Sequence, residues 1–176
     1  MWMTGVLCFV AAKGEEIKTY YKAYCNLGGA EMLSQIEAAV EECAAVVQEL
    51  LESEPIHPGE YDCICSPEVT GMIAHEAFGH GVEMDMFVKK RALAEQYIGE
   101  RVASELVTMH DGASAANEVA SYFFDDEGTM AHDTTVIEKG ILKSGISDLQ
   151  SAMLLKTCPT GNGRRESFRR KAYTRM

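Results

Sequence analysis

The segment His75-Glu76-Ala77-Phe78-Gly79-His80 brings together the residue types of a metal site. Neutral imidazole is a common ligand for zinc, and a carboxylate beside such ligands can take a proton from an attacking water molecule. Helical zinc proteases space their two histidines at i and i+4, whereas His75 and His80 are spaced at i and i+5. Five residues of regular helix turn about 500°, which leaves the two side chains roughly 140° apart. A zinc site therefore requires the helix to widen or to end between them.

Glycine at position 79 offers a way to bring the two histidines together. Glycine adopts unusual backbone conformations at little cost and commonly ends helices. We expect the helix to bulge as a π turn, or to end, near Phe78-Gly79, so that His80 swings back beside His75. The change Gly79→Val is then expected to abolish metal binding and to spare most of the fold. The spacing alone also allows two ordinary histidines near a helix end, with Glu76 as a solvated carboxylate.

Composition limits the classes of function. The chain has 176 residues, 47% hydrophobic and 24% charged, which suffices for a domain with an apolar core. Its net charge of −11 disfavours non-specific binding to nucleic acid. The apolar start of the chain lacks a positive region and is too short to span a bilayer, so no membrane segment is predicted.

Basic residues crowd only the C-terminal end: Arg164, Arg165, Arg169, Arg170, Lys171 and Arg175. This tail is either solvated or a patch that binds a ligand's carboxylate or backbone carbonyl groups.

The six cysteines do not have the spacing of a zinc ribbon. Buried free thiols in a reducing compartment are the favoured interpretation. The alternative is that Cys63 and Cys65, two residues apart, supply metal ligands.

The acidic cluster Asp125-Asp126-Glu127 has neither the length nor the spacing of a calcium-binding loop, so we expect a solvated acidic turn.

Periodicity predicts the elements that must position these residues. In the first half we expect a hairpin at 6–25, a long amphipathic helix at 31–52 and a short strand at 61–66. The next helix begins at Ser66-Pro67 and carries His75 and Glu76. In the second half we expect strands at 103–109 and 120–124, a hairpin at 134–143, a helix at 148–155 and a glycine-bearing loop at 157–163. The predicted fold class is α+β, with a hairpin and long helix, a strand, the metal-motif helix and a mainly antiparallel β region.

Five stretches, in order and at matching distances, resemble the TldD/PmbA family of metalloproteases, also called modulators of DNA gyrase. They are His75–Glu83, Val102–Thr108, Phe124–Thr129, Val136–Lys143 and Pro159–Ser167. The similarity is to the TldD branch. It implies a zinc-dependent peptidase that acts on small or unfolded peptides in the cytoplasm, as a homodimer or paired with an inactive TldE/PmbA-like homologue. By this resemblance, His75 and His80 are zinc ligands and Glu76 is the general base.

Two departures from the family pattern shape these expectations. The family takes its third zinc ligand from a cysteine nearer its C-terminus, and none of the six cysteines here stands in that place. The family also has a sizeable portion before the first hairpin. We therefore expect a central fragment, incomplete at both ends and inactive or nearly so on its own. Residues 1–90 would end an N-terminal α/β domain, and 91–176 would begin a β-rich C-terminal domain.

Two functions remain open, together with the role of one loop. The leading interpretation is a peptidase, and the alternative is a non-catalytic partner subunit or peptide-binding module of a TldD/TldE-type complex. Within the glycine-bearing loop, Asn162, Arg164 and Arg165 are predicted to bind the peptide substrate, because arginine pairs well with carboxylate. The other possibility for this loop is a purely structural role beside the site.

Overall fold

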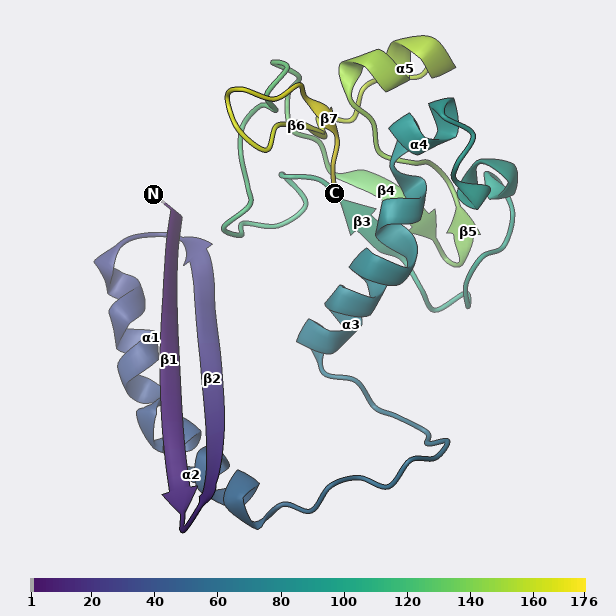
Figure 1. Cartoon of the computed structure of the whole chain (residues 1–176). Helices are drawn as coiled ribbons and strands as arrows, with labels where there is room; N and C mark the ends of the chain where they lie inside the picture. Colours follow the sequence, from purple (N-terminus) through teal and green to yellow (C-terminus); the bar gives the residue numbers. More distant parts are fainter. Residues whose placement is uncertain (1) are drawn as a thin grey trace. The chain divides into compact units, whose positions relative to one another are not determined.

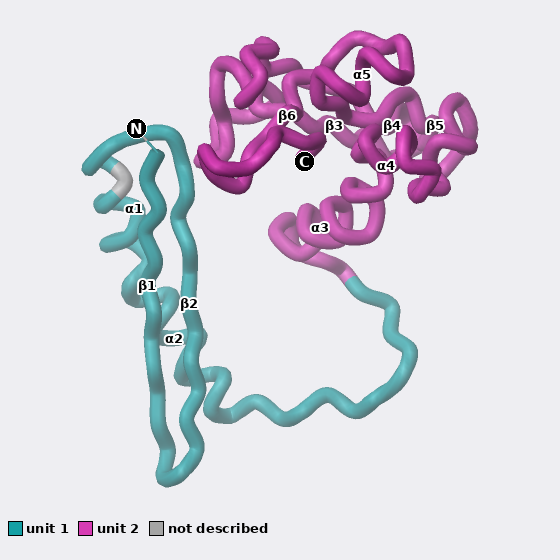
Figure 2. The backbone as a smooth tube through the Cα atoms, turned by 45° about the horizontal axis from the view of Figure 1, so that its top comes forward, with its two compact units in different colours: residues 1–63 teal, residues 64–176 magenta. Residues whose placement is uncertain are grey.

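The structure is a computed structural model that describes residues 2–176, except for the side chain of Met32. Its contacts divide the chain into two compact units, residues 1–63 and 64–176, which are coloured separately in Figure 2. The contacts group the metal-motif helix with the residues that follow it. The domain boundary expected after residue 90 stays a prediction. No helix among residues 2–176 is long and apolar enough to cross a membrane.

Unit 1 is a long antiparallel hairpin packed against helices (Figure 1). Strands β1 (Trp2–Lys13) and β2 (Glu16–Leu27) pair along their whole length, which confirms the predicted hairpin. Lys13 pairs with Glu16, and Gly14 has a φ of 64° in the tight turn between them, a conformation that glycine adopts easily. The predicted helix at 31–52 is also confirmed, in three parts: a 3₁₀ turn and helices α1 and α2, at Ala30–Met32, Leu33–Ala38 and Val40–Glu52.

The buried face of this helix agrees in part with its apolar series. Periodicity predicts that this series faces the core: Met32, Ile36, Val40, Ala44, Val47 and Leu51. Val47 is buried and Ile36, Ala44 and Leu51 are half-buried, whereas Val40 is 41% exposed and the side chain of Met32 lies outside the described part of the chain. Ala39 and Cys43, outside the series, are also buried, and the helix breaks at Ala39 between α1 and α2.

The predicted strand at 61–66 is absent, and so is the expected burial of most cysteines. Residues 61–66 run as irregular chain, with Tyr61 and Ile64 exposed, because among the described residues no strand pairs with them. A strand needs a hydrogen-bonded neighbour, which apolar sequence alone does not supply. Of the six cysteines only Cys43 is buried, and the other five are exposed free thiols.

Unit 2 begins with the metal-motif helix and continues through short elements. Pro67 occupies the first position of α3 and Ser66 the N-cap, as predicted, although the Ser66 side chain makes no capping hydrogen bond. Helix α3 (Pro67–Ile73) is followed by a π turn (Ala74–Phe78) and a 3₁₀ turn (Gly79–Val82). Helix α4 (Met84–Val88) and a second 3₁₀ turn (Leu93–Tyr97) come next.

The core of unit 2 lies beside a three-stranded antiparallel sheet. It contains β3 (Met109–Asp111), β4 (Thr134–Glu138) and β5 (Ile141–Leu142) in that order. The predicted hairpin at 134–143 is confirmed, and its turn residues Lys139 and Gly140 have φ values of 46° and 83°. The buried apolar residues against the sheet are Val82, Val136, Ile137, Leu142 and Ile146.

The strands predicted at 103–109 and 120–124 are wrong, apart from Met109 at the start of β3. Residues 103–108 instead turn across the tip of the β4–β5 hairpin, where Ala103 N–H donates to Gly140 O and Val107 N–H to Ser104 O. Residues 120–124 are irregular except for Phe124, which forms an isolated antiparallel bridge with Met130, and Phe123 is exposed. Both segments have strand-like composition, but their backbone groups are bonded in turns and loops.

The C-terminal part places a helix and a small two-stranded sheet beside this core. Helix α5 (Leu149–Leu155) confirms the predicted helix, and Asp148 caps it by accepting the Ser151 N–H at 2.6 Å. Strands β6 (Gly163–Arg164) and β7 (Tyr173–Thr174) are antiparallel. The acidic turn at 125–129 forms as predicted, but Asp125 is not solvated. It is 4% exposed and accepts hydrogen bonds from the N–H groups of Glu127, Thr129 and Gly163.

Candidate metal centre

A π turn brings His75 and His80 together, as the spacing required. The Gly79 N–H donates to the carbonyl of Ala74, five residues back, and also to that of His75. This wider turn accommodates one extra residue, so side chains at i and i+5 share a face. The two imidazole rings meet edge to face, with centroids 4.5 Å apart and planes at 80°. The predicted bulge is therefore confirmed.

The role expected for Gly79 needs correction. Its backbone is ordinary right-handed helix, φ −58° and ψ −48°, and the unusual conformation lies one residue earlier, at Phe78 with φ −128° and ψ −45°. A Cβ at position 79 would collide with the thioether end of Met176. Glycine is thus needed here for space and not for its dihedral freedom. Because the end of a methionine side chain moves easily, Gly79→Val is expected to weaken the site less than complete loss.

Within residues 2–176, one group of three or more side chains is arranged to hold a metal ion: His75, Glu76 and His80. One ligand atom from each lies within 4.8 Å of the others, and His80 Nε2 is 3.9 Å from Glu76 Oε2. Ligands about 2.1 Å from a tetrahedral zinc ion are roughly 3.4 Å apart, so small side-chain rotations suffice. The two imidazoles suit zinc as ligands, and the exposed Glu76 carboxylate lies beside them.

Glu83 contacts the His80 ring at the nitrogen Nδ1, which is not the nitrogen near Glu76. Its carboxylate Oε1 lies 2.9 Å from His80 Nδ1, and its side chain is only 9% exposed. The same oxygen accepts the Met176 N–H at 3.3 Å and lies 3.9 Å from Arg175 Nη1. Glu83 therefore links the motif to Arg175 and Met176, the two residues that follow β7.

Asp111 is a half-buried carboxylate near the motif. Burial raises the pKa of the Asp111 carboxyl, while the hydrogen bond from Asn162 and the nearby His75 oppose this rise and Glu83 adds to it. Asn162 Nδ2 donates to Asp111 Oδ1 at 2.6 Å. Asp111 thus lies at the end of β3 within the electrostatic reach of one predicted zinc ligand.

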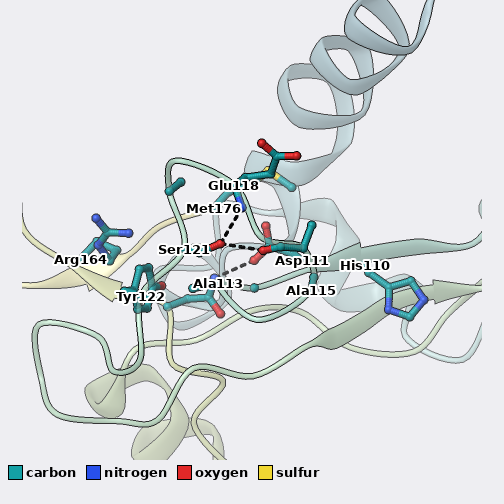
Figure 3. Close-up of a pocket in the computed structure, with 13 residues that line it drawn as sticks. His110, Asp111, Ala113, Ala115, Glu118, Ser121, Tyr122, Arg164 and Met176 are labelled. Atoms are coloured by element: carbon teal, nitrogen blue, oxygen red, sulfur yellow. Dashed lines mark hydrogen bonds between the residues drawn. The ribbon is translucent and has the colours of Figure 1, made fainter. Parts of the chain in front are cut away.

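A cavity of about 240 Å³ adjoins this region. Asp111 and Met176 form part of its wall, and both interact with the motif region. Figure 3 shows Arg164 and Tyr122 side by side at one end and His110 at the other. The Arg164 guanidinium stacks over the Tyr122 ring at 4.4 Å, and its Nε is 3.8 Å from Asp126 Oδ2. Four alanines, Ala113, Ala115, Ala116 and Ala120, line much of the wall, and Glu118 and Ser121 add polar groups to it.

The three residues predicted to bind substrate occupy different positions. Arg164 lines the cavity. Asn162 also reaches it but is 2% exposed, and its amide is engaged by Asp111, Thr160 and the Arg175 carbonyl. Arg165 is exposed; its backbone N–H donates to Asp126 Oδ2, and its side chain reaches the Asp126 carbonyl.

Sequence reasoning missed Glu83, Asp111 and Tyr122. Glu83 follows His80 by three residues in the same motif, and that spacing was a signal that could have found it. Asp111 and Tyr122 carry no comparable signal. They meet the site only because β3 and the loop at 112–122 pass beside it.

Comparison with known proteins gives consistent matches. Residues 58–176 match the model of the PmbA/TldA metallopeptidase C-terminal domain. A metalloprotease of Methanothermobacter thermautotrophicus is 34% identical over 157 residues, which cover 88% of this chain and 34% of that protein. A zinc metalloprotease TldD homolog of Saccharolobus solfataricus is 33% identical over 132 residues, or 74% of this chain and 29% of that protein. The chain thus spans about a third of the length of these curated relatives.

The fold comparison agrees. The crystal structure of TldE from Thermococcus kodakarensis superposes with a TM-score of 0.74, covering 98% of this chain and 39% of that one at 20% identity. This likeness confirms the α+β fold. The family model covers more than half of the chain and includes all five stretches on which the resemblance was based. The chain belongs to the TldD/PmbA metallopeptidase family.

Proposed function

We propose that the chain carries the zinc-binding and proton-transfer part of a peptidase that hydrolyses small or unfolded peptides. The observation that carries the proposal is the π turn, which places His75 and His80 on one face with Glu76 beside them. The relative from Saccharolobus solfataricus is named a zinc metalloprotease, which supports zinc as the metal.

Each residue of the cluster has a distinct role in this proposal. His75 and His80 hold the ion through imidazole nitrogen atoms. Zinc, when bound, polarises the peptide carbonyl and makes water more acidic. Glu76 accepts the proton of the attacking water and later delivers it to the leaving amine. Its exposure and its distance of 3.9 Å from His80 Nε2 suit a group that faces substrate.

The cavity beside the cluster is the proposed place for a substrate residue. Arg164 is the group there best suited to a peptide carboxylate, because stacking on Tyr122 holds its guanidinium plane. Arg165 would add positive charge outside the cavity, and Asn162 would act by holding Asp111 and the backbone of Arg175. The change Arg164→Ala is expected to raise KM for peptides with a free C-terminus more than for amidated ones.

The assembly and location of the protein are also proposals. Pairing with a TldE/PmbA-like homologue, or with a second copy, would fit a family in which both TldD and TldE occur. We place the protein in the cytoplasm. A non-catalytic partner or peptide-binding module is the second candidate, supported by the shared fold with TldE.

Zinc binding by this chain tests the metal site. Because the chain on its own is expected to be inactive or nearly so, peptide cleavage is measured on the chain joined to the C-terminal part of the Methanothermobacter thermautotrophicus relative, with matched variants. Glu76→Gln should retain zinc but lose about 10²- to 10⁴-fold in cleavage rate. The double change His75→Ala and His80→Ala should lose zinc. His57→Ala is the control, because His57 lies in unit 1, outside the cluster.

The results separate the two candidates. Zinc binding with no cleavage in the joined protein favours the peptide-binding module. Equal, measurable cleavage by the joined protein and its Glu76→Gln variant contradicts the assignment of the base. Unchanged zinc affinity in the double variant contradicts the metal site itself.

A further inference from the structure

Glu83 has the position of a residue that orients a zinc ligand. It follows the 3₁₀ turn Gly79–Val82, and its carboxylate Oε1 lies 2.9 Å from His80 Nδ1. We infer that Glu83 is a positioning residue that holds the His80 ring with Nε2 directed toward His75 and Glu76. The inference rests on the proposed zinc site and concerns the protein's own side chains.

The chemistry of the contact selects one form of the His80 ring. An ionised carboxylate only accepts hydrogen bonds, so the His80 Nδ1 must carry the hydrogen that it shares with Glu83. Nε2 of the neutral ring then has a free lone pair. This is the nitrogen that lies 3.9 Å from Glu76 Oε2, on the side of the metal cluster. A carboxylate that accepts the second N–H of a ligating histidine also makes the ligand more basic.

The rest of the fold holds Glu83 in place. Its Oε1 accepts the Met176 N–H, and the Arg175 guanidinium lies 3.9 Å away. Arg175 is itself fixed through its backbone, because its N–H donates to Asn162 O and its carbonyl accepts from Asn162 Nδ2. These donors offset the cost of burying a carboxylate. The orientation of His80 therefore depends on residues 162 and 175–176, far away in sequence.

Asp85 provides a matched control. It lies two residues after Glu83, its side chain is 14% exposed, and it pairs with Lys89 at 2.6 Å. Its described hydrogen bond and ion pair are to Lys89, and it has none to His75, Glu76 or His80. Asp85→Asn thus removes a carboxylate of similar burial from the same segment without touching the zinc cluster.

Nuclear magnetic resonance of the metal-free, ¹⁵N-labelled chain is the first test. At about pH 8.5, where imidazole is ordinarily neutral, long-range ¹H–¹⁵N spectra identify which ring nitrogen carries the hydrogen. We expect His80 to carry it on Nδ1 in the unaltered chain and in Asp85→Asn, and to lose that preference in Glu83→Ala. The change His80→Gln assigns the signal. An Nε2–H form in the unaltered chain overturns the inference.

Competition for Zn²⁺ against a coloured chelator is the second test. Glu83→Ala should weaken zinc binding roughly 10- to 100-fold. Glu83→Gln should weaken it less, because the amide oxygen still accepts from Nδ1, and Asp85→Asn should leave it unchanged. Equal affinities for Glu83→Ala, Asp85→Asn and the unaltered chain overturn the inference, and the ring measurement on the unaltered chain decides it when Glu83→Ala fails to fold. If the unaltered chain binds no zinc, the proposed function fails, while the ring measurement still decides the role of Glu83.

Discussion

In unit 1 long regular elements enclose a small apolar core, whereas in unit 2 short elements are joined by buried polar side chains. The strands β1 and β2 each have 12 residues, while the longest strand of unit 2, β4, has five. All buried polar residues among those described lie in unit 2: Glu83, Ser121, Asp125, Ser147, Asp148, Ser151, Asn162 and Thr174. Repeated apolar contacts suffice to hold a hairpin on a helix. A metal site needs specific hydrogen bonds between segments distant in sequence.

The largest stability effect is expected at Asp125 in unit 2. Asp125→Ala leaves three backbone N–H groups without their acceptor, at Glu127, Thr129 and Gly163. A buried donor that loses a charged acceptor costs about 1–3 kcal/mol; the Gly163 N–H is buried and the other two are partly buried, so a loss of roughly 3 kcal/mol is expected. Hydrogen exchange read by mass spectrometry should show faster exchange in residues 64–176 and not in 1–63.

The neighbouring residue Asp126 is the control for this prediction. Its side chain is 44% exposed, so Asp126→Ala should destabilise unit 2 much less. If Asp125→Ala and Asp126→Ala have equal effects, the buried network does not hold unit 2 together, and the contrast between the units fails.

A smaller loss is expected at Val47 in unit 1. Val47 is 4% exposed on α2, and Val47→Ala removes two buried methyl groups, for about 2 kcal/mol. Val40→Ala makes the same chemical change at a 41% exposed site on the same helix and should cost less than about 0.5 kcal/mol. Hydrogen exchange in residues 1–63 measures both. Equal costs would mean that the face containing Ala39, Cys43 and Val47 is not the core.

The smallest effect, and the one that depends on pH, is expected at Asp111. Because burial raises the pKa of its carboxyl, the folded protein binds this proton more tightly than the unfolded chain. The favourable contribution is complete below the ordinary pKa of aspartate and is lost as pH rises through the raised pKa. Asp111→Asn, whose amide oxygen still accepts from Asn162, should therefore melt higher than the unaltered protein at pH 8.

The comparison of melting temperatures between pH 8 and pH 4, with chelator present, completes the Asp111 test. The advantage of Asp111→Asn should shrink as pH falls, because the protonated aspartic acid is also neutral. A variant that is less stable than the unaltered protein at pH 8 would show that the Asp111 charge stabilises the site.

Local patterns predicted the fold well where contacts are local. The hairpin at 6–25, the helix at 31–52, the hairpin at 134–143 and the π turn at 74–78 all follow from periodicity, turn residues or spacing. The predictions at 61–66, 103–109 and 120–124 were wrong for a shared reason. Strand formation depends on a partner, and sequence composition does not reveal whether one is available.

The candidate site shows the same difference between local and long-range contacts. His75, Glu76 and His80 were found from the sequence because a single helical turn holds them, and the sequence also required the bulge that joins them. Tertiary structure alone decided the surroundings: the burial of Asp125, the cavity beside Arg164 and the support of His80 by Glu83 and residues 175–176. The physical reason is the separation along the chain over which each kind of interaction acts. Helical geometry acts over a few residues, whereas burial and buried hydrogen bonds arise only when distant segments pack together.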